Sequence, residues 1–155
     1  MFNDYEIMVR KYYDPLINQY KLKFVKENND SFFLVGNGFA LNIFIDRMDR
    51  RGDILYVSLS CEGIIRIHTL MYINKERFTE QDRMVAGNPK TVDEYIEATF
   101  RVDVSGLRNH CSDILSGDTQ WLKDYPDQGD YNKIIAQFIT PYFQQQGHYV
   151  KLMEE

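Results

Sequence analysis

The sequence predicts an α+β fold in which an N-terminal helix precedes a four-stranded antiparallel meander, with C-terminal helices packed on the sheet. Three observations support this fold class. Apolar residues recur at helical spacing near the start of the chain, alternate with polar residues between positions 22 and 61, and return to helical spacing after position 91. Because the strands are consecutive in sequence and the later helices follow them, an antiparallel sheet is favoured over a parallel, doubly wound one.

The length of the chain favours one domain that spans residues 1–155. With 155 residues, of which 44% are hydrophobic and 14% aromatic, the chain can bury one core and is too short for two. This composition also offsets the entropy lost on folding, which argues against disorder.

The first predicted element is an amphipathic helix. Asn3 or Asp4 is a suitable N-cap, because both side chains accept hydrogen bonds from the first helical amides. Pro15 is expected to kink this helix or to restart it. The residues at near-helical spacing are Ile7, Met8, Lys11, Tyr12, Leu16 and Ile17.

Four short strands are predicted between Leu22 and Cys61. Turn residues separate runs that alternate with a period of two, and the last of these turns, Asp49–Gly52, is charged. Tight turns between consecutive strands produce an antiparallel meander. The side chains expected to face a helix-covered core are Leu41, Ile43, Leu55, Val57 and Leu59.

The segment from Ile64 to Ile73 fits two structures. Its apolar residues match one helix face, which we favour, but its β-branched residues would also extend the sheet. The polar stretch from Thr79 to Lys90 is expected to be a loop.

Two longer helices are predicted in the C-terminal half. The run Thr91-Val92-Asp93-Glu94 has the pattern of a capping box and therefore predicts a helix start. Ser105-Gly106 is a candidate break in this helix, and Ser116-Gly117 ends it. After a loop, Asp130 is expected to cap the last helix, which Pro141 should bend.

Charge and hydropathy argue against two classes of partner. The formal net charge of −5 disfavours binding to a phosphate backbone, so no nucleic-acid partner is expected. No stretch reaches the roughly 18 apolar residues of a membrane span, and the start of the chain lacks a signal-peptide pattern. We therefore expect a cytoplasmic protein with no membrane partner. The sequence carries no signal for an oligomeric state.

The chain lacks the common motifs of catalysis and metal binding. His68, His110 and His148 do not have the spacing of metal ligands, and no phosphate-binding loop, dinucleotide fingerprint or nucleophile elbow is present. Cys61 and Cys111 have neither metal-site nor disulfide spacing, and both are expected to be reduced, buried thiols. We therefore predict no catalytic residue, no metal ligand and no cofactor.

Carboxylates around one turn leave another interpretation open. Asp46, Asp49 and Asp53 could serve acid/base or metal chemistry if folding brought a pair of them into a cleft. Arginines are interleaved with them, at positions 47, 50 and 51, and this pattern favours a solvated turn.

An acidic segment at positions 118–130 is the best candidate for partner binding. It contains the only Trp of the chain among several aspartates, between two predicted helices. For Trp121 we favour a structural role at the end of the core, whereas the alternative is contact with a cationic partner. The predicted partner-binding residues are Asp118, Trp121, Asp124, Tyr125, Asp127 and Asp130.

Three features of the chain occur together, namely the N-terminal helix, the strands Phe39–Asp46 and Asp53–Leu59, and Ile114–Asp118 followed by Trp121. In these features the chain resembles small bacterial α+β proteins, some of which are immunity proteins of toxin/immunity systems. The resemblance implies a stoichiometric protein inhibitor that works without a cofactor.

Two functions follow as hypotheses. The first is a non-catalytic, immunity-type protein that binds and neutralises a cognate protein, such as a cationic toxin. The alternative is a small enzyme or a small-ligand-binding α+β domain, whose site would be assembled from distant segments. A deep, largely apolar pocket with convergent polar groups would favour the alternative.

Overall fold

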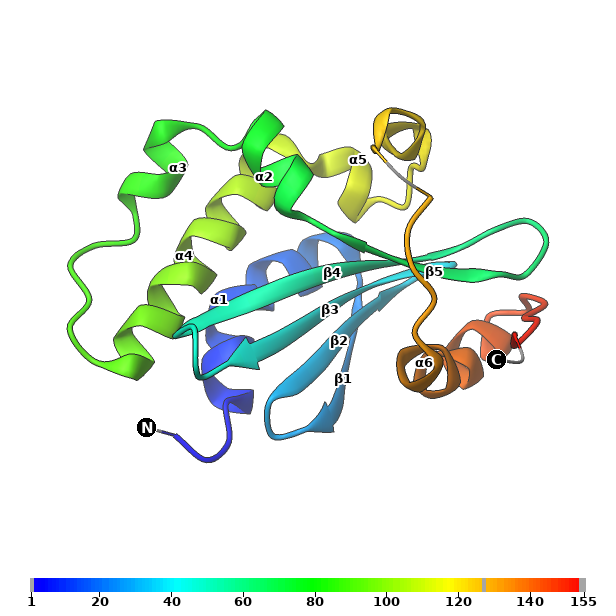
Figure 1. The fold of residues 1–155 in the computed structure, drawn as a ribbon, viewed down its shortest axis with the longest axis horizontal. Helices are drawn as coiled ribbons and strands as arrows, with labels where there is room; N and C mark the ends of the chain where they lie inside the picture. Colours follow the sequence, from blue (N-terminus) through cyan, green and yellow to red (C-terminus); the bar gives the residue numbers. More distant parts are fainter. Residues whose placement is uncertain (1, 127, 154–155) are drawn as a thin grey trace.

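The computed structural model describes residues 2–126 and 128–153, and it confirms the α+β fold with five strands rather than four. All neighbouring strands are antiparallel and the order is β1-β2-β3-β4-β5, as Figure 1 shows. The strands are β1 (Lys23–Asn28), β2 (Ser31–Gly36), β3 (Phe39–Asp46), β4 (Arg51–Leu59) and β5 (Ile65–Thr69).

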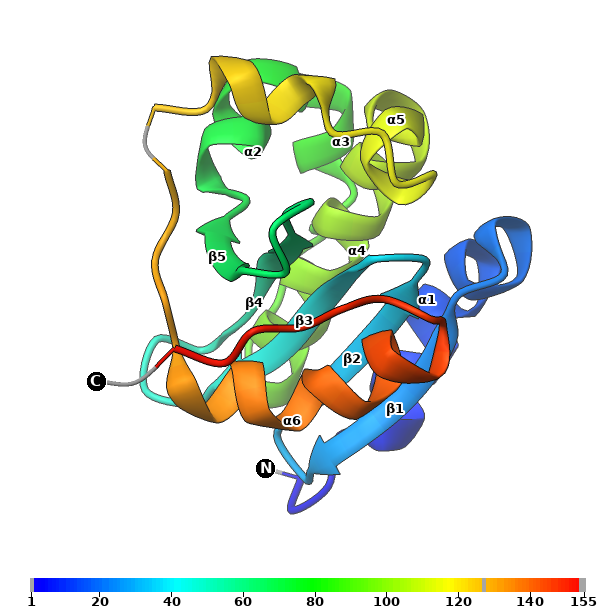
Figure 2. The ribbon, with the colours of Figure 1, turned by 90° about the vertical axis from the view of Figure 1, so that its right-hand side faces the viewer.

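Helices cover both faces of this sheet (Figures 1 and 2). The helices α1 (Glu6–Tyr20) and α4 (Val92–His110) lie against one face, and α6 (Lys133–Gln145) lies against the other. Each face therefore carries its own buried apolar cluster, and the strands contribute to both. The continuous apolar run Phe32 to Val35 of β2 reflects this double burial.

The prediction that five meander residues share one core is wrong. Leu41 and Ile43 pack towards α1 and α4, whereas Val57, with the partly buried Leu55 and Leu59, packs towards α6. The register explains the difference, because Leu41 is paired with Tyr56 and paired residues point to the same face. Odd positions of β3 and odd positions of β4 consequently point to opposite faces.

The segment from Ile64 to Ile73 is neither all helix nor all strand. Its first part is β5, which pairs with β4 from Leu55↔Thr69 to Leu59↔Ile65. Its last part begins α2 (Met71–Arg77). The favoured helix was therefore wrong for residues 65–69, where the β-branched Ile65 and Ile67 pack on the face of the sheet that α6 covers.

Residues 79–90 are not entirely a loop, because they contain the short helix α3 (Glu80–Met84). Thr79 and Asp82 form a capping box, in which Thr79 Oγ1 accepts from the Asp82 amide and Asp82 accepts from the Thr79 amide. Thr91 caps α4 as predicted, since its Oγ1 accepts from the Glu94 amide.

The long helix α4 continues through the predicted break at Ser105-Gly106. Gly106 is needed there for close packing, because a Cβ at this position would lie 2.3 Å from the Phe78 ring. The helix ends at His110, with Cys111 as its C-cap, rather than at the predicted Ser116-Gly117, and the short helix α5 (Ser112–Leu115) follows.

Two further sequence predictions need correction. Asp130 does not cap α6, since Asn132 does so through a hydrogen bond from the Ile135 amide. Cys61 is exposed in the turn after β4, whereas Cys111 is buried as expected. None of the helices in the described parts of the chain combines the length and apolar character required to cross a membrane.

Candidate functional site

The predicted partner-binding segment runs from the end of α5, through a 3-10 helix (η1, Gln120–Asp124), past the outer edge of β5 to α6 (Figure 2). It is attached to β5 by backbone hydrogen bonds, since the Ile67 amide donates to the Asp130 carbonyl and the Asp130 amide donates to the Ile67 carbonyl. Residues 128–132 therefore cover the edge of the sheet near Ile67.

Aromatic side chains hold this segment against the sheet. Trp121 is only 5% exposed and meets the Tyr56 ring edge-on, with 4.8 Å between the ring centroids. Tyr125 packs edge-on against His68, and its hydroxyl donates to the Thr69 carbonyl at 2.8 Å. Trp121 thus has the structural role that we favoured, because its buried ring packs the segment against the sheet.

The carboxylates of the segment differ from Trp121 in exposure. Asp118, Asp124 and Asp130 are all exposed. Asp118 also accepts a hydrogen bond from the Gln120 amide, which stabilises the turn before η1. Asp127 lies outside the described residues. The structure therefore leaves three of the predicted carboxylates exposed, and the one nearest to β5 is Asp130, whose backbone pairs with Ile67.

His68 is a residue of this region that the sequence did not single out. It is 5% exposed, and its Nε2 lies 3.2 Å from Ser58 Oγ on the neighbouring strand. Both residues line a cavity of about 480 Å³ with Leu122, Lys123, Tyr125, Pro126 and Gln128. The alternation of β5 places His68 on the opposite face of the sheet from Ile65 and Ile67, which pack towards α6.

A larger cavity, of about 570 Å³, lies at the other end of β4. It opens because β5 ends at Thr69, opposite Leu55, so the outer edge of residues 51–54 lacks a strand partner. Helix α4 crosses this open edge, where Thr99 Oγ1 accepts from the Gly52 amide at 2.7 Å. The apolar part of the wall consists of Ile54, Leu70, Met71, Phe78, Ala86, Pro89, Ala98, Val102 and Leu107.

Two carboxyl groups line this cavity, Asp53 from β4 and Asp103 from α4. Burial raises the pKa of Asp103 to about 8, and the neighbouring Asp53 carboxylate adds to the shift. Burial also raises the pKa of Asp53, although Arg51 Nε donates to its Oδ2 at 3.1 Å and opposes the shift. The sequence had suggested Asp53 for a cleft, whereas it had not suggested Asp103.

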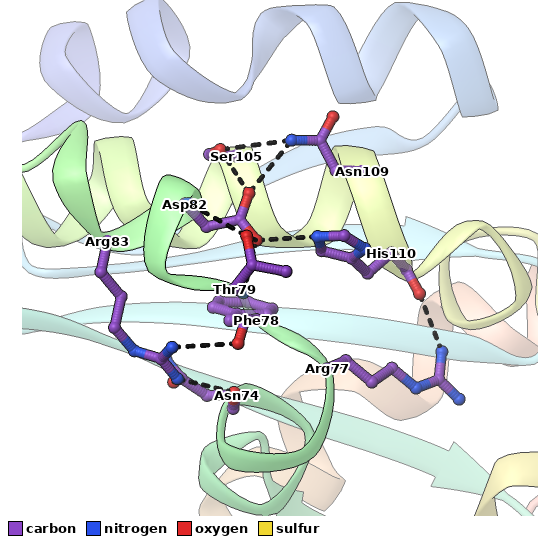
Figure 3. Close-up of polar contacts among 9 residues, drawn as sticks. All are labelled: Asn74, Arg77, Phe78, Thr79, Asp82, Arg83, Ser105, Asn109 and His110. Atoms are coloured by element: carbon purple, nitrogen blue, oxygen red, sulfur yellow. Dashed lines mark hydrogen bonds and ion pairs between the residues drawn. The ribbon is translucent and has the colours of Figure 1, made fainter.

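On another side of α4, Asp82 is the centre of a polar network that Figure 3 shows. Its Oδ1 accepts from Ser105 Oγ at 2.8 Å and from Asn109 Nδ2 at 3.0 Å. Its Oδ2 accepts from the Thr79 amide at 2.8 Å and from Thr79 Oγ1 at 3.1 Å, and His110 Nε2 lies 2.8 Å away. Burial alone would raise the pKa of Asp82, but these hydrogen bonds lower it well below 3.8.

This network has the character of a structural joint. Asp82 is 1% exposed and its two oxygens are fully engaged, so it links α3 to α4. Arg77 extends the joint, because it donates to the His110 carbonyl and makes a bidentate pair with Asp113. Burial raises the pKa of the adjacent Cys111 thiol to about 11, which leaves no thiolate for nucleophilic chemistry at neutral pH.

Within residues 2–126 and 128–153, no three His, Cys, Asp or Glu side chains are grouped so that they could hold a metal ion. Comparisons of the chain with known protein families, with curated proteins and with solved structures found no match. The candidate sites therefore stand on their own geometry, as the acidic surface of the segment 118–130 and the cavity that contains Asp103.

Proposed function

We propose that this protein is a non-catalytic binding protein of the immunity type, which acts in the cytoplasm and neutralises a cationic protein partner. The observation that carries the proposal is the set of exposed carboxylates Asp118, Asp124 and Asp130 on a segment with a buried aromatic base. Fixed negative charge on a surface accelerates the encounter with a positively charged partner and orients it.

The attachment of the segment supports this proposal. Trp121 is buried, Tyr125 is hydrogen-bonded to β5, and the backbone of Asp130 is paired with Ile67. A surface that is already ordered before binding loses less conformational entropy when the complex forms. The acidic side chains can therefore contribute to association without first ordering the backbone that carries them.

The test reverses two of these charges in a double variant, Asp124→Lys with Asp130→Lys. Neither side chain makes a hydrogen bond or an ion pair with another described residue, so folding should be unaffected. The partner to be tested is the product of an adjacent reading frame. The expected result is slower association, by about tenfold at low salt, and a weaker dependence of the association rate on ionic strength.

A matched control is the double variant Asp14→Lys with Glu76→Lys, which makes the same change of net charge at exposed positions outside the segment. If both double variants slow association equally, net charge rather than this surface steers the partner. If the wild-type protein does not bind the adjacent gene product at all, the immunity-type function is wrong.

A second candidate function is a small-ligand-binding domain or a small enzyme, and the cavity beside β4 favours it. Its volume of about 570 Å³ falls in the range of small-molecule sites, and its apolar wall carries two carboxyl groups with raised pKa values. Saturable binding of a small molecule at this cavity would distinguish this function from binding at the segment 118–130.

A further inference from the structure

Asp103 occupies a position on α4 that an apolar residue would normally fill. It follows Phe100 by three residues and precedes Leu107 by four, and both of these residues are completely buried. Side chains at such spacing lie on the same face of a helix. The face that α4 presents to the sheet is therefore interrupted by one carboxyl group.

No described residue pairs with this carboxyl group. Asp103 is half-buried and has neither a hydrogen bond nor a salt bridge with residues 2–126 or 128–153, whereas the other buried carboxylate, Asp82, has several donors. An unpaired carboxyl group in an apolar setting destabilises the fold. A ligand that supplies the missing donor would remove this cost.

The other charged side chains that line the cavity already have partners. Arg51 pairs with Asp53 at 3.1 Å and with Asp49 at 3.8 Å, and the Arg50 guanidinium lies over the Tyr95 ring at 5.3 Å. Asp103 is thus the one carboxyl group in the wall that keeps its capacity for a donor, as far as the described residues extend. Tyr13 of α1 also lies close enough for Asp103 to contribute to its raised pKa.

The remaining surroundings of Asp103 suit an apolar stem. The wall of the cavity includes the apolar residues Phe78, Val102 and Leu107. It also includes two residues with exposed side chains, Met71 (72% exposed) and Tyr95 (39% exposed). A chain of methylene groups that enters past Met71 and Tyr95 would bury apolar surface along its length. A positively charged end group would then reach a carboxyl group that lacks a donor.

We propose that this cavity binds an ammonium or guanidinium group carried on an apolar stem, with the cation against Asp103. The proposal rests on the second candidate function and is independent of partner binding by the segment 118–130. Two sources can present this chemistry, namely a free alkylamine and the side chain of a lysine or arginine in a peptide.

Proton release is a consequence of this arrangement. Because Asp103 titrates near pH 8, its carboxyl group is mostly protonated at pH 7 in the free protein. A bound cation favours the ionised form, so binding at pH 7 should release close to one proton. The same ligand should bind more tightly as the pH rises from 6 to 8, as long as its own amine stays protonated.

The experiment is a titration of the ¹⁵N-labelled protein with hexylammonium, with hexanol as the uncharged control of similar size. We expect saturable shifts of amides from Ala98 to Leu107 and from Gly52 to Ile54, and binding of hexanol about tenfold weaker. In the variant Asp103→Asn, the preference for hexylammonium over hexanol should disappear. Asp103 has no partner in the described structure, so this substitution should not disturb the fold.

Calorimetry at pH 7 in two buffers with different ionisation enthalpies counts the released protons. A tripeptide Gly-Lys-Gly then identifies the source, because tighter binding than hexylammonium assigns the site to a basic side chain of a peptide and weaker binding assigns it to a free amine. Asp14→Asn, an exposed position on α1, serves as the control for a lost carboxylate.

Equal binding of hexylammonium and hexanol, or an unchanged preference in Asp103→Asn, would overturn the cation site but leave a ligand-binding cavity. The absence of saturable shifts with both probes would overturn the second candidate function as well. These two failures are therefore distinguishable in one set of titrations.

Discussion

Asp82 and Asp103 lie on neighbouring helices of the same fold, yet their surroundings shift their pKa values in opposite directions. Asp82 is only 1% exposed, but hydrogen bonds from Thr79, Ser105 and Asn109 lower its pKa and keep it ionised. Asp103 has no such donor, and burial raises its pKa to about 8. The difference indicates that hydrogen-bond donors can outweigh the effect of burial on the pKa of a carboxyl group, whereas burial dominates where donors are lacking.

The largest expected effect is the loss of stability when Asp82 is removed. Asp82→Ala leaves the donors of Ser105, Asn109 and the Thr79 amide without their acceptor and opens the joint between α3 and α4. We expect the free energy of unfolding to fall by about 3 kcal/mol, measured by urea denaturation at pH 7. Glu80→Gln, at an exposed position of the same helix, is the control and should cost much less.

The pH dependence of this effect follows from the lowered pKa of Asp82. In the unfolded chain the Asp82 carboxylate takes up a proton near pH 3.8, whereas in the folded protein it stays ionised to lower pH. The stabilisation is therefore complete only above about pH 4. It is lost as the pH falls further. A destabilisation of Asp82→Ala that is the same at pH 2.5 and at pH 7 would contradict this account.

A smaller effect, of opposite sign, is expected from Asp103→Leu. The variant replaces the carboxyl group by a side chain that suits the buried face of α4, and at pH 8 we expect a gain of about 2 kcal/mol in the free energy of unfolding. Between pH 3.8 and about pH 8, Asp103 is protonated in the folded wild-type protein but ionised in the unfolded chain. Its stability therefore falls as the pH rises through this range.

The comparison of urea midpoints at pH 4.5 and pH 8 measures this effect. The gain from Asp103→Leu should be larger at pH 8 than at pH 4.5, and Asp103→Asn should show the same difference between the two pH values with a smaller gain at each. Equal gains at both pH values would mean that Asp103 is not held protonated by the fold.

The smallest effect concerns the two thiols, which report on local opening. Cys61 is exposed, whereas Cys111 is buried beside His110 at the end of α4, and burial raises the pKa of its thiol to about 11. Under native conditions Cys61 should be alkylated at least about a hundredfold faster than Cys111. Mass spectrometry at several times of labelling measures both rates in one sample.

The same labelling compares the two carboxyl groups directly. Asp82→Ala should accelerate the labelling of Cys111, because the network next to it is broken, while Asp103→Asn should leave it unchanged. The rate at Cys61 is the internal control in each variant. Acceleration by both substitutions would show that the two carboxyl groups belong to one cooperative unit.

The parts of the predicted partner-binding segment differ in burial. The sequence pattern places aspartates and aromatics together between positions 118 and 130. It does not separate Trp121, which is buried against Tyr56, from Asp124, which is exposed. That separation depends on contacts with β4 and β5, which are more than fifty positions away in the sequence.

Asp103 illustrates a signal that was present in the sequence and was missed. Its spacing from Phe100 and Leu107 places a carboxyl group on the apolar face of a helix, and such an interruption indicates either a polar network or a binding site. Spacing alone does not distinguish the two, because Asp82 belongs to a network and Asp103 lines a cavity.

The sequence by itself determined the α+β class, the antiparallel meander and the helix that Thr91 caps, because these features depend on local periodicity, turns and hydrogen bonds between near neighbours. Only the tertiary structure decided that β5 stops at Thr69, that α6 covers the second face of the sheet, and that Asp103 meets an open strand edge. These features depend on which distant segments pack together, and the free energy of that packing is shared among many residues rather than encoded in one local pattern.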